Sequence, residues 1–299
     1  MVNEAHHRPE TRQLTLALLA PLRARGFTHL AVEALADPPL PKGYPTLDTG
    51  YYTREPVFAE LLRAAMRLGF VLVPYEPAST PSQTQQQRET GMAATLAALV
   101  RAQPGAKVLV HAGYGHIGKT AGSQPGGADP MALAFMRLSG LPILSVDQTR
   151  LTWEDGAAAN RLARTFGVQV PAVLVGRQDH RAWSGEPQRF DASVLLPATD
   201  ASALRPDWLI LAGRRQPVAV DLTSCNTHLP CLAEARYAGE GDDAIPADQF
   251  VLLVDGETDT PLYLAPGQYR LRLTGPDDTV LADRTLDVPA PRPSPSDTP

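Results

Sequence analysis

Apolar residues recur at helical spacing in several stretches of the chain, and each stretch is followed by a short apolar run. In the first, residues 9–26, Leu14, Leu18 and Leu22 fall on one helical face, and the apolar run 28–34 comes next. An amphipathic stretch of this length followed by a short apolar run predicts a helix and then a buried strand. The same order predicts four further pairs of a helix and a following strand. These are helix 56–69 with strand 70–76, helix 88–105 with strand 106–116, helix 131–140 with strand 142–148, and helix 160–167 with strand 171–176.

Helices and strands that alternate at this spacing are typical of a parallel sheet whose faces are covered by helices. The sequence therefore predicts an α/β fold with a mainly parallel sheet flanked by helices. A parallel sheet also requires a strand before the first helix, and only Met1 and Val2 precede the polar residues that begin at Asn3. These residues show no signal-peptide pattern. Two interpretations stay open: the chain start is misplaced, so that a first strand and an export signal are lost, or the sheet begins with a very short edge strand.

The pattern changes near residue 205. Apolar runs at 207–213 and 217–223 have only Arg214–Gln216 between them, which predicts a hairpin. From Phe250 onward, short apolar runs separated by turn residues predict a small antiparallel β-module, with strands at 250–256, 260–267, 268–275 and 279–288.

These patterns divide the chain into three parts. Residues 1–243 are predicted to form the α/β domain, whose first strand is missing under one of the two interpretations above. Residues 244–289 are predicted to form the β-rich module, and the Pro-rich tail at 290–299 is expected to be disordered.

The composition excludes several classes of protein. The 299 residues are 43% hydrophobic and 20% charged, with a net charge of −5, which is enough apolar content for a folded core. A mildly acidic balance without basic clusters argues against nucleic-acid binding. No apolar run approaches the ~20 residues that cross a bilayer. We expect a small-molecule or peptide substrate as partner, no nucleic acid and no membrane span, and an oligomer stays open.

The two cysteines, Cys225 and Cys231, lie in the segment SCNTHLPC. At this spacing they can form a disulfide in a turn, stay as two thiols, or act as ligands with His228 between them. Structural zinc normally needs four ligands, and the sequence has no second cysteine pair. A disulfide would indicate a compartment outside the cytosol.

Titratable side chains gather where the predicted strands end. In parallel α/β sheets the carboxyl ends of the strands form the usual ligand site, and four of the seven histidines fall at two such ends. The residues there are Glu4, His6 and His7 with Arg12 one helical turn later, then Glu33, then Glu76, and finally His111, Tyr114 and His116.

This set of side chains suits the activation of water. A His or Glu can take a proton from water, a second His can protonate a leaving group, and an Arg can hold an oxyanion. The same His and carboxylate groups could ligate a metal ion. Structural explanations exist too: Glu4 could cap a helix, Arg12 could pair with Glu4 or Glu10, and Arg88–Glu89 is either a surface pair or part of the site.

On these residues the chain resembles the superfamily that joins the erythromycin-esterase-like proteins, the haem-binding ChaN-like proteins and the Tiki/TraB group. The segments that carry the resemblance are NEAHHRPETR and LAVEAL, then GYYTREPVFAELLRAAMRLGF, RETGMAATLA and VLVHAGYGHIGK. A strand-end Glu and His, a helix Arg, a second strand-end Glu and a later His-containing loop follow one another as in that superfamily. The resemblance covers residues 1–150 well and 150–235 loosely.

The esterase branch implies roles for five residues. Glu4 and His7 match the first-strand Glu and the His that activates water there, and Glu33 matches the second-strand Glu. Arg12 is similar to the helix Arg, and His116 is similar to the His of the later motif, with His111 as its alternative. ChaN-like relatives imply haem binding at an oligomer interface through a Tyr, and Tiki relatives imply a metal-dependent peptidase. The tyrosine candidates are Tyr51, Tyr52 and Tyr114.

The leading expectation is a hydrolase with an unknown substrate. His7 is the expected general base and Glu4 orients it, while Arg12 and His116 stabilise developing charge and Glu33 holds Arg12 or a metal ion. The secondary or ligand candidates are His6, His111, Glu76, Arg88 and Tyr114.

Two other classes stay open. One is a haem- or metal-binding protein of the ChaN-like type that uses the same histidines, with haem or a divalent metal ion as cofactor; the hydrolase interpretation requires neither. The other is a surface protein whose β-module mediates attachment and whose site is relict. In its full-length form the protein is expected outside the cytoplasm, in the periplasm or envelope of a bacterium.

Overall fold

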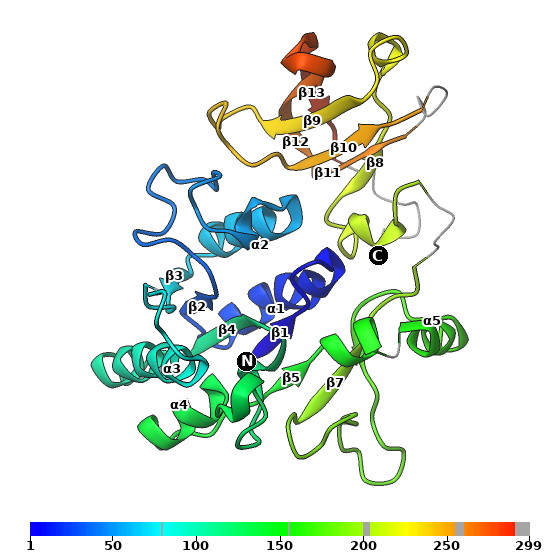
Figure 1. Ribbon diagram of the computed structural model, residues 1–299. Coiled ribbons are helices and arrows are strands. Elements are labelled where there is room, and N and C mark those ends of the chain that lie inside the picture. Colours follow the sequence, from blue (N-terminus) through cyan, green and yellow to red (C-terminus); the bar gives the residue numbers. More distant parts are fainter. Residues whose placement is uncertain (79, 155, 200–203, 255–259, 291–299) are drawn as a thin grey trace. The chain divides into compact units, whose positions relative to one another are not determined.

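The computed structural model describes residues 1–78, 80–154, 156–199, 204–254 and 260–290. They form two compact units (Figure 1). The domain boundary predicted from the sequence lies at 243–244 and the change of pattern near 205, and the units divide the chain near residue 198. Unit 1 comprises Met1–Arg54 and Leu61–Ala198, and unit 2 comprises Glu55–Glu60 and Thr199–Pro299.

Unit 1 is built on a seven-stranded sheet with the strand order β3-β2-β4-β1-β5-β7-β6. Neighbouring strands run parallel, except that β6 pairs antiparallel with β7. The mainly parallel α/β fold predicted from the sequence is therefore confirmed. The strands are β1 (Val2–Glu4), β2 (His29–Val32), β3 (Val71–Pro74), β4 (Val108–Gly113), β5 (Val146–Asp147), β6 (Ala172–Val173) and β7 (Ala192–Leu195).

Local capping residues define two of the helix ends. Thr84 and Gln87 form a reciprocal capping box at the start of α3, and α4 ends at Gly140, whose left-handed backbone (φ 71°) favours glycine. The helices are α1 (Gln13–Ala24), preceded by a 3-10 turn at Pro9–Arg12, α2 (Pro56–Arg67), which crosses the division between the units, α3 (Gln85–Ala102), α4 (Met131–Ser139) and α5 (Gly156–Thr165).

The strand that precedes α1 is short, but it lies in the interior of the sheet. β1 pairs with β4 on one side and with β5 on the other, so that Val2 lies opposite both His111 and Val146. All three residues of β1 are buried. The expectation of a short edge strand is therefore wrong. Hydrogen bonds to a neighbouring strand on each side stabilise these three residues, which a single neighbouring strand would hold only weakly. Val2–Glu4 supplies the strand that the parallel pattern requires.

Unit 2 confirms the antiparallel β-module. Its main sheet has the order β10-β9-β12-β13, all antiparallel, and β11 pairs with β8 in a second small sheet. Leu222, Leu264, Tyr269 and Leu273 are among the buried residues of its core. The strands are β8 (Gln216–Val218), β9 (Cys231–Tyr237), β10 (Asp248–Leu252), β11 (Leu262–Leu264), β12 (Gly267–Thr274) and β13 (Val280–Val288).

One prediction for this region is wrong. Residues 207–213 do not form a strand; Asp207–Ile210 form a 3-10 turn that ends at Leu211, and β8 pairs with β11 rather than within a hairpin. The turn begins after Pro206, and it buries Leu209 and Leu211 without any strand pairing. A short apolar run cannot by its spacing alone be told from a buried helical turn.

Cys225 and Cys231 form a disulfide bond just before β9, which decides among the three alternatives for this pair. In the described part of the chain, no helix has the length and apolar character needed to cross a bilayer. The predicted strand end at 255–256 lies outside the described residues, as does the Pro-rich tail beyond Ala290.

Candidate functional site

The carboxyl ends of three neighbouring strands bring most candidate residues together. β2, β4 and β1 are adjacent in the sheet, so that Glu33 directly after β2, His111 in β4 and Glu4 at the end of β1 lie at one edge. β4 continues into a 3-10 turn, Tyr114–Ile117, which carries His116. All of these residues belong to unit 1.

Glu4 is buried, and its carboxylate lies at the centre of a saturated network. Arg12 donates its Nε–H to Oε2 at 2.6 Å and an Nη2–H to Oε1 at 3.2 Å. His111 Nε2 lies 3.0 Å from Oε2, and His6 Nδ1 lies 2.7 Å from Oε1. Burial alone would raise the pKa of Glu4, but the two histidines and the Arg12 charge hold that pKa well below its ordinary range. Glu4 is therefore an anion that can only accept, so both histidines donate to it.

This carboxylate fixes the tautomer of His6. Because Nδ1 donates to Glu4, the neutral imidazole carries its lone pair on Nε2. The ring stacks on Tyr52, with centroids 3.6 Å apart and planes 8° apart, and meets the Tyr114 ring edge-on at 5.1 Å. The His6 side chain is 14% exposed. The ring is thus held on three sides and stays within reach of solvent.

Gly113 provides the space for the His6 ring. A Cβ atom at position 113 would lie 2.3 Å from His6 Nε2 and 3.1 Å from Glu33 Oε2, far inside van der Waals contact. The backbone N–H of Gly113 also donates to Glu33 Oε2. A side chain at this position would displace the imidazole, so the need for glycine here is a need for close approach.

Glu33 lies between two histidines. Its Oε1 is 4.0 Å from His6 Nε2 and 3.4 Å from His116 Nε2, and it accepts a hydrogen bond from Arg88 Nη2 at 2.8 Å. Burial disfavours the ionised form of Glu33, but the hydrogen bonds from His116 and Gly113 and the surrounding positive charge lower its pKa far below the ordinary value. One carboxylate oxygen therefore faces both imidazole Nε2 atoms.

His116 is held as a cation. Its Nδ1 lies 2.7 Å from Glu89 Oε1, and its Nε2 faces Glu33. Burial would lower the pKa of His116, but the two carboxylates outweigh it and raise that pKa to about 9. Arg88 Nη1 lies 3.0 Å from Nε2, and its positive charge opposes protonation of His116, but it is one cation against the two carboxylates. The two carboxylates thus favour the form in which both ring nitrogens of His116 carry protons, whereas Arg88, which can only donate, favours an unprotonated Nε2.

Arg88 belongs to the site and is not a surface pair with Glu89. Its Nε donates to Glu76 Oε1 at 2.6 Å, and its Nη2 reaches Glu33. These two carboxylates raise the pKa of Arg88 against the opposing effect of burial. Glu76 also accepts the backbone N–H of Ala34 at 3.1 Å, which ties the carboxyl ends of β2 and β3 together. With its side chain 27% exposed, Arg88 stays within reach of a ligand.

Two pairings expected from the sequence need correction. Glu4 orients His6, and not His7; His7 is exposed and its Nδ1 lies 3.0 Å from the Tyr114 hydroxyl. Glu33 binds Arg88, and not Arg12, which is buried against Glu4 and donates a further bond to the His6 carbonyl at 2.8 Å. The backbone turns sharply after β1, so successive side chains leave the strand end in different directions.

Glu89 and Tyr52 are the contributors that the sequence pattern did not assign to the catalytic set. Glu89 could have been found, because it shares the buried face of α3 with Met92, Ala93 and Leu96 at helical spacing. An acidic residue on an apolar stripe needs a buried partner. Tyr52 lies in a Pro- and Gly-rich loop, where no periodicity indicates which way a side chain points.

The donor set does not fit a divalent metal ion. Each carboxylate oxygen of Glu4 is already bonded to Arg12 and a histidine, and Glu33 is bonded to Arg88 and the Gly113 N–H. Two guanidinium groups in these positions would repel a cation. Among the described residues, no group of three or more His, Cys, Asp or Glu side chains is arranged to hold a metal ion.

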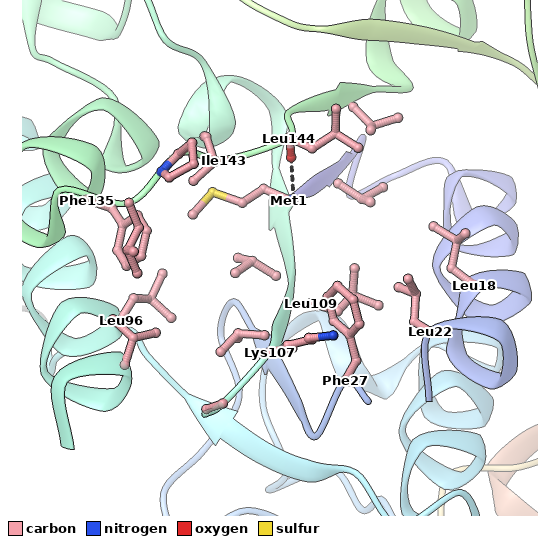
Figure 2. A pocket seen from close by; sticks show the side chains of 18 residues that line it. Met1, Leu18, Leu22, Phe27, Leu96, Lys107, Leu109, Phe135, Ile143 and Leu144 are labelled. Atoms are coloured by element: carbon pink, nitrogen blue, oxygen red, sulfur yellow. Dashed lines mark hydrogen bonds between the residues drawn. The ribbon is translucent and has the colours of Figure 1, made fainter. Parts of the chain in front are cut away.

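A cavity of about 390 Å³ lies at the opposite, amino edge of the same sheet. Leu18 and Leu22 of α1 point into it from one side, and Leu96 of α3 and Phe135 of α4 from the other (Figure 2). Its lining is almost entirely apolar. No side chain of the Glu4–Glu33 cluster lines it, so this cavity is not where the ionisable groups meet.

Comparison of the chain with protein-family models, with curated proteins and with solved structures gives no match.

Proposed function

We propose that the carboxyl edge of unit 1 is a metal-independent acid–base site that activates water for hydrolysis of a small-molecule or peptide substrate. One observation carries the proposal: the buried anion Glu4 binds His6 Nδ1 at 2.7 Å, which leaves the basic Nε2 of the neutral ring facing Glu33 and His116. A buried carboxylate that orients an imidazole is the usual way to prepare a histidine as general base.

The two histidines have opposite roles, one as the base and the other as the acid. His6 Nε2 accepts a proton from water as the oxygen attacks the carbonyl carbon of an ester or amide. His116 donates its Nε2 proton to the leaving oxygen or nitrogen as the bond to the carbonyl carbon breaks. Both Nε2 atoms lie within 4.0 Å of Glu33 Oε1, so one substrate group placed there can reach both.

The arginines hold this arrangement and its charge. Arg12 is 1% exposed and donates to Glu4 and to the His6 carbonyl, so its role is to keep Glu4 ionised and in place. Arg88 is the guanidinium accessible to a ligand, and it can stabilise an oxyanion as charge develops.

The test is hydrolysis of a panel of esters and peptides by the wild-type protein, followed by His6→Ala and His7→Ala variants. For any substrate that is turned over, loss of a general base predicts that His6→Ala reduces kcat by about 10²–10⁴-fold. His7→Ala is the matched control, because the neighbouring exposed histidine does not contact Glu4. Equal losses in the two variants, or a loss in His7→Ala alone, would contradict the assignment, and no turnover across the panel would leave no support for hydrolysis.

Haem binding is a second candidate, favoured by the exposed aromatic side chains near the site. Tyr51 is 71% exposed and Tyr114 is 41% exposed, and His7 is exposed beside the Tyr114 hydroxyl. A surface phenolate or imidazole can serve as an axial haem ligand. Titration with haemin should then give a Soret band that shifts in Tyr51→Phe or His7→Ala, whereas a spectrum equal to that of free haemin would exclude this function.

We also propose that the protein works outside the cytoplasm. The Cys225–Cys231 disulfide supports this location, because reducing compartments keep such pairs as thiols. Mass spectrometry of alkylated protein from the native host should find both cysteines blocked; two free thiols would contradict the proposal.

A further inference from the structure

Glu89 is a completely buried carboxylate on the apolar face of α3. Burying an ionised carboxylate is unfavourable unless hydrogen bonds and charge compensate it. Three partners do so: Gln85 Nε2 at 2.6 Å, the backbone N–H of Met131 at 2.7 Å, and His116 Nδ1 at 2.7 Å.

These partners are not equivalent. Gln85 lies one turn earlier on α3 and is a neutral amide, and the Met131 N–H is the first of α4. They donate to different oxygens of Glu89, so a Gln at position 89, with one acceptor oxygen, could keep the bond from either Met131 or Gln85 but not from both in these positions. Of the three partners only His116 can itself take up a charge, so only its protonation depends directly on the charge of Glu89.

We propose that Glu89 is the positioning residue that keeps His116 protonated and directs its Nε2–H into the site. The inference rests on the proton-donor role that the proposed function gives to His116. With Nδ1 bound to Glu89 from the buried side, Nε2 is the nitrogen that faces Glu33. Glu89 then does for the acid what Glu4 does for the base. Glu33 lies closer to His116 Nε2 (3.4 Å) than to His6 Nε2 (4.0 Å), so it favours the protonated ring more strongly at His116.

The charged groups around His116 define what else could set its protonation. Glu33 faces it from the end of β2, and Arg88 and Glu89 face it from α3. Arg189 approaches the same turn, with Nη2 3.1 Å from the place of a Cβ on Gly115. Both arginines disfavour the cation, so the two carboxylates must supply the charge that keeps it.

The experiment is a histidine titration followed by NMR on the full chain. In the wild type His116 should titrate with a pKa of about 9. Loss of an opposite charge at this distance should lower that pKa by about 1–3 units in Glu89→Gln. Glu76→Gln is the control, because Glu76 is a carboxylate of the same cluster that binds Arg88 and not His116; it should change the value much less. Glu89→Asp keeps the charge and should largely restore the wild-type value.

An unchanged His116 titration in Glu89→Gln would overturn the proposal and leave Glu89 as a structural link between α3 and α4. Should Glu89→Gln fail to fold, the wild type decides: at neutral pH both ring nitrogens of His116 should give imidazolium ¹⁵N shifts, with an Nδ1 proton protected from exchange. A neutral ring or a rapidly exchanging Nδ1 proton contradicts it. These readouts need no substrate, so failure of the hydrolysis screen and failure of this inference are separate results.

Discussion

The two edges of the unit 1 sheet differ in how the space between their side chains is filled. At the carboxyl edge, Glu4 and Glu33 are buried among arginines and histidines that fill the space with ionic contacts. At the amino edge, a cavity of about 390 Å³ is lined by apolar side chains, and Lys107 is the one charged side chain among its described lining residues (Figure 2). The ionisable groups therefore gather where the protein has filled its own space, and the cavity lies at the other edge.

This difference has a physical origin. Ionised groups can be buried only when each is paired and hydrogen-bonded, so the carboxyl edge is crowded with partners that hold one another in fixed positions. Fixed partners also hold an acid and a base ready, because little reorganisation is needed when charge moves. An apolar cavity has no such requirement, and its walls lose only packing contacts.

The largest expected effect on stability breaks the ionic network at the carboxyl edge. Glu4→Gln leaves the Arg12 guanidinium, which is 1% exposed, without its anion, and we expect a loss of about 3–5 kcal/mol in the free energy of unfolding. Urea denaturation measures it. Asp129→Asn is the control, because its partner Arg137 is 57% exposed and exposed ion pairs contribute far less to stability than buried ones. Equal losses in the two variants would mean that Glu4 is not the centre of the network.

A truncation at the amino edge should lower stability and leave the site alone. Leu96→Ala removes a buried side chain that lines the cavity, which predicts a loss of about 2–5 kcal/mol. The His116 titration should stay as in the wild type. Leu144→Ala, in the same lining but 65% exposed, should change stability by no more than about 0.5 kcal/mol. A shifted His116 titration in Leu96→Ala would show that the two edges are coupled.

Gly113→Ala tests how tightly the carboxyl edge is filled. The added Cβ would lie 2.3 Å from His6 Nε2, so the ring must leave its stack on Tyr52, at an overpacking cost of about 1–3 kcal/mol. Nuclear Overhauser effects between His6 and Tyr52 should disappear. Gly105→Ala, where no heavy atom lies within 4 Å of the added Cβ, should preserve them. Their persistence in Gly113→Ala would show that the site is looser than the structure indicates.

The smallest expected effect is a dependence of stability on pH. The pKa of His116 is raised from 6.5 to about 9 by its two carboxylates, so its contribution is complete below about pH 6.5 and is lost as the pH rises toward 9. The pKa values of Glu4 and Glu33 are lowered, so their contribution is present above about pH 4.5 and is lost as the pH falls. Urea denaturation at several pH values should therefore show a maximum between these limits. In His116→Gln the alkaline decline should be weaker; an unchanged decline would place its origin elsewhere.

The sequence was sufficient for the fold and for the neighbourhood of the candidate site. Alternating helix and strand patterns gave the parallel sheet, and strand ends indicated where Glu4, Glu33, His111 and His116 gather. Which histidine binds Glu4 could not be read from the sequence, because it depends on the backbone direction after β1 and on the space left by Gly113. Partners that come from different elements, such as Arg88 with Glu33, depend likewise on tertiary packing.

The errors came from short segments. A three-residue strand gives too little pattern to show whether it lies inside a sheet or at its edge, and pairing with both β4 and β5 places β1 inside. The run 207–213 is as apolar as a strand, but it forms a 3-10 turn after Pro206. Hydrophobic periodicity could predict neither the interior position of β1 nor the turn at 207–210, because several repeats are needed before helix and strand can be distinguished.

The central claim is that Glu4 prepares His6 as a base, and the ¹⁵N spectrum of the His6 ring tests it most directly. For the neutral His6 ring of the wild-type protein, the account predicts a proton on Nδ1 and the lone pair on Nε2. A neutral ring protonated on Nε2 would mean that Nδ1 does not donate to Glu4, and would contradict the account.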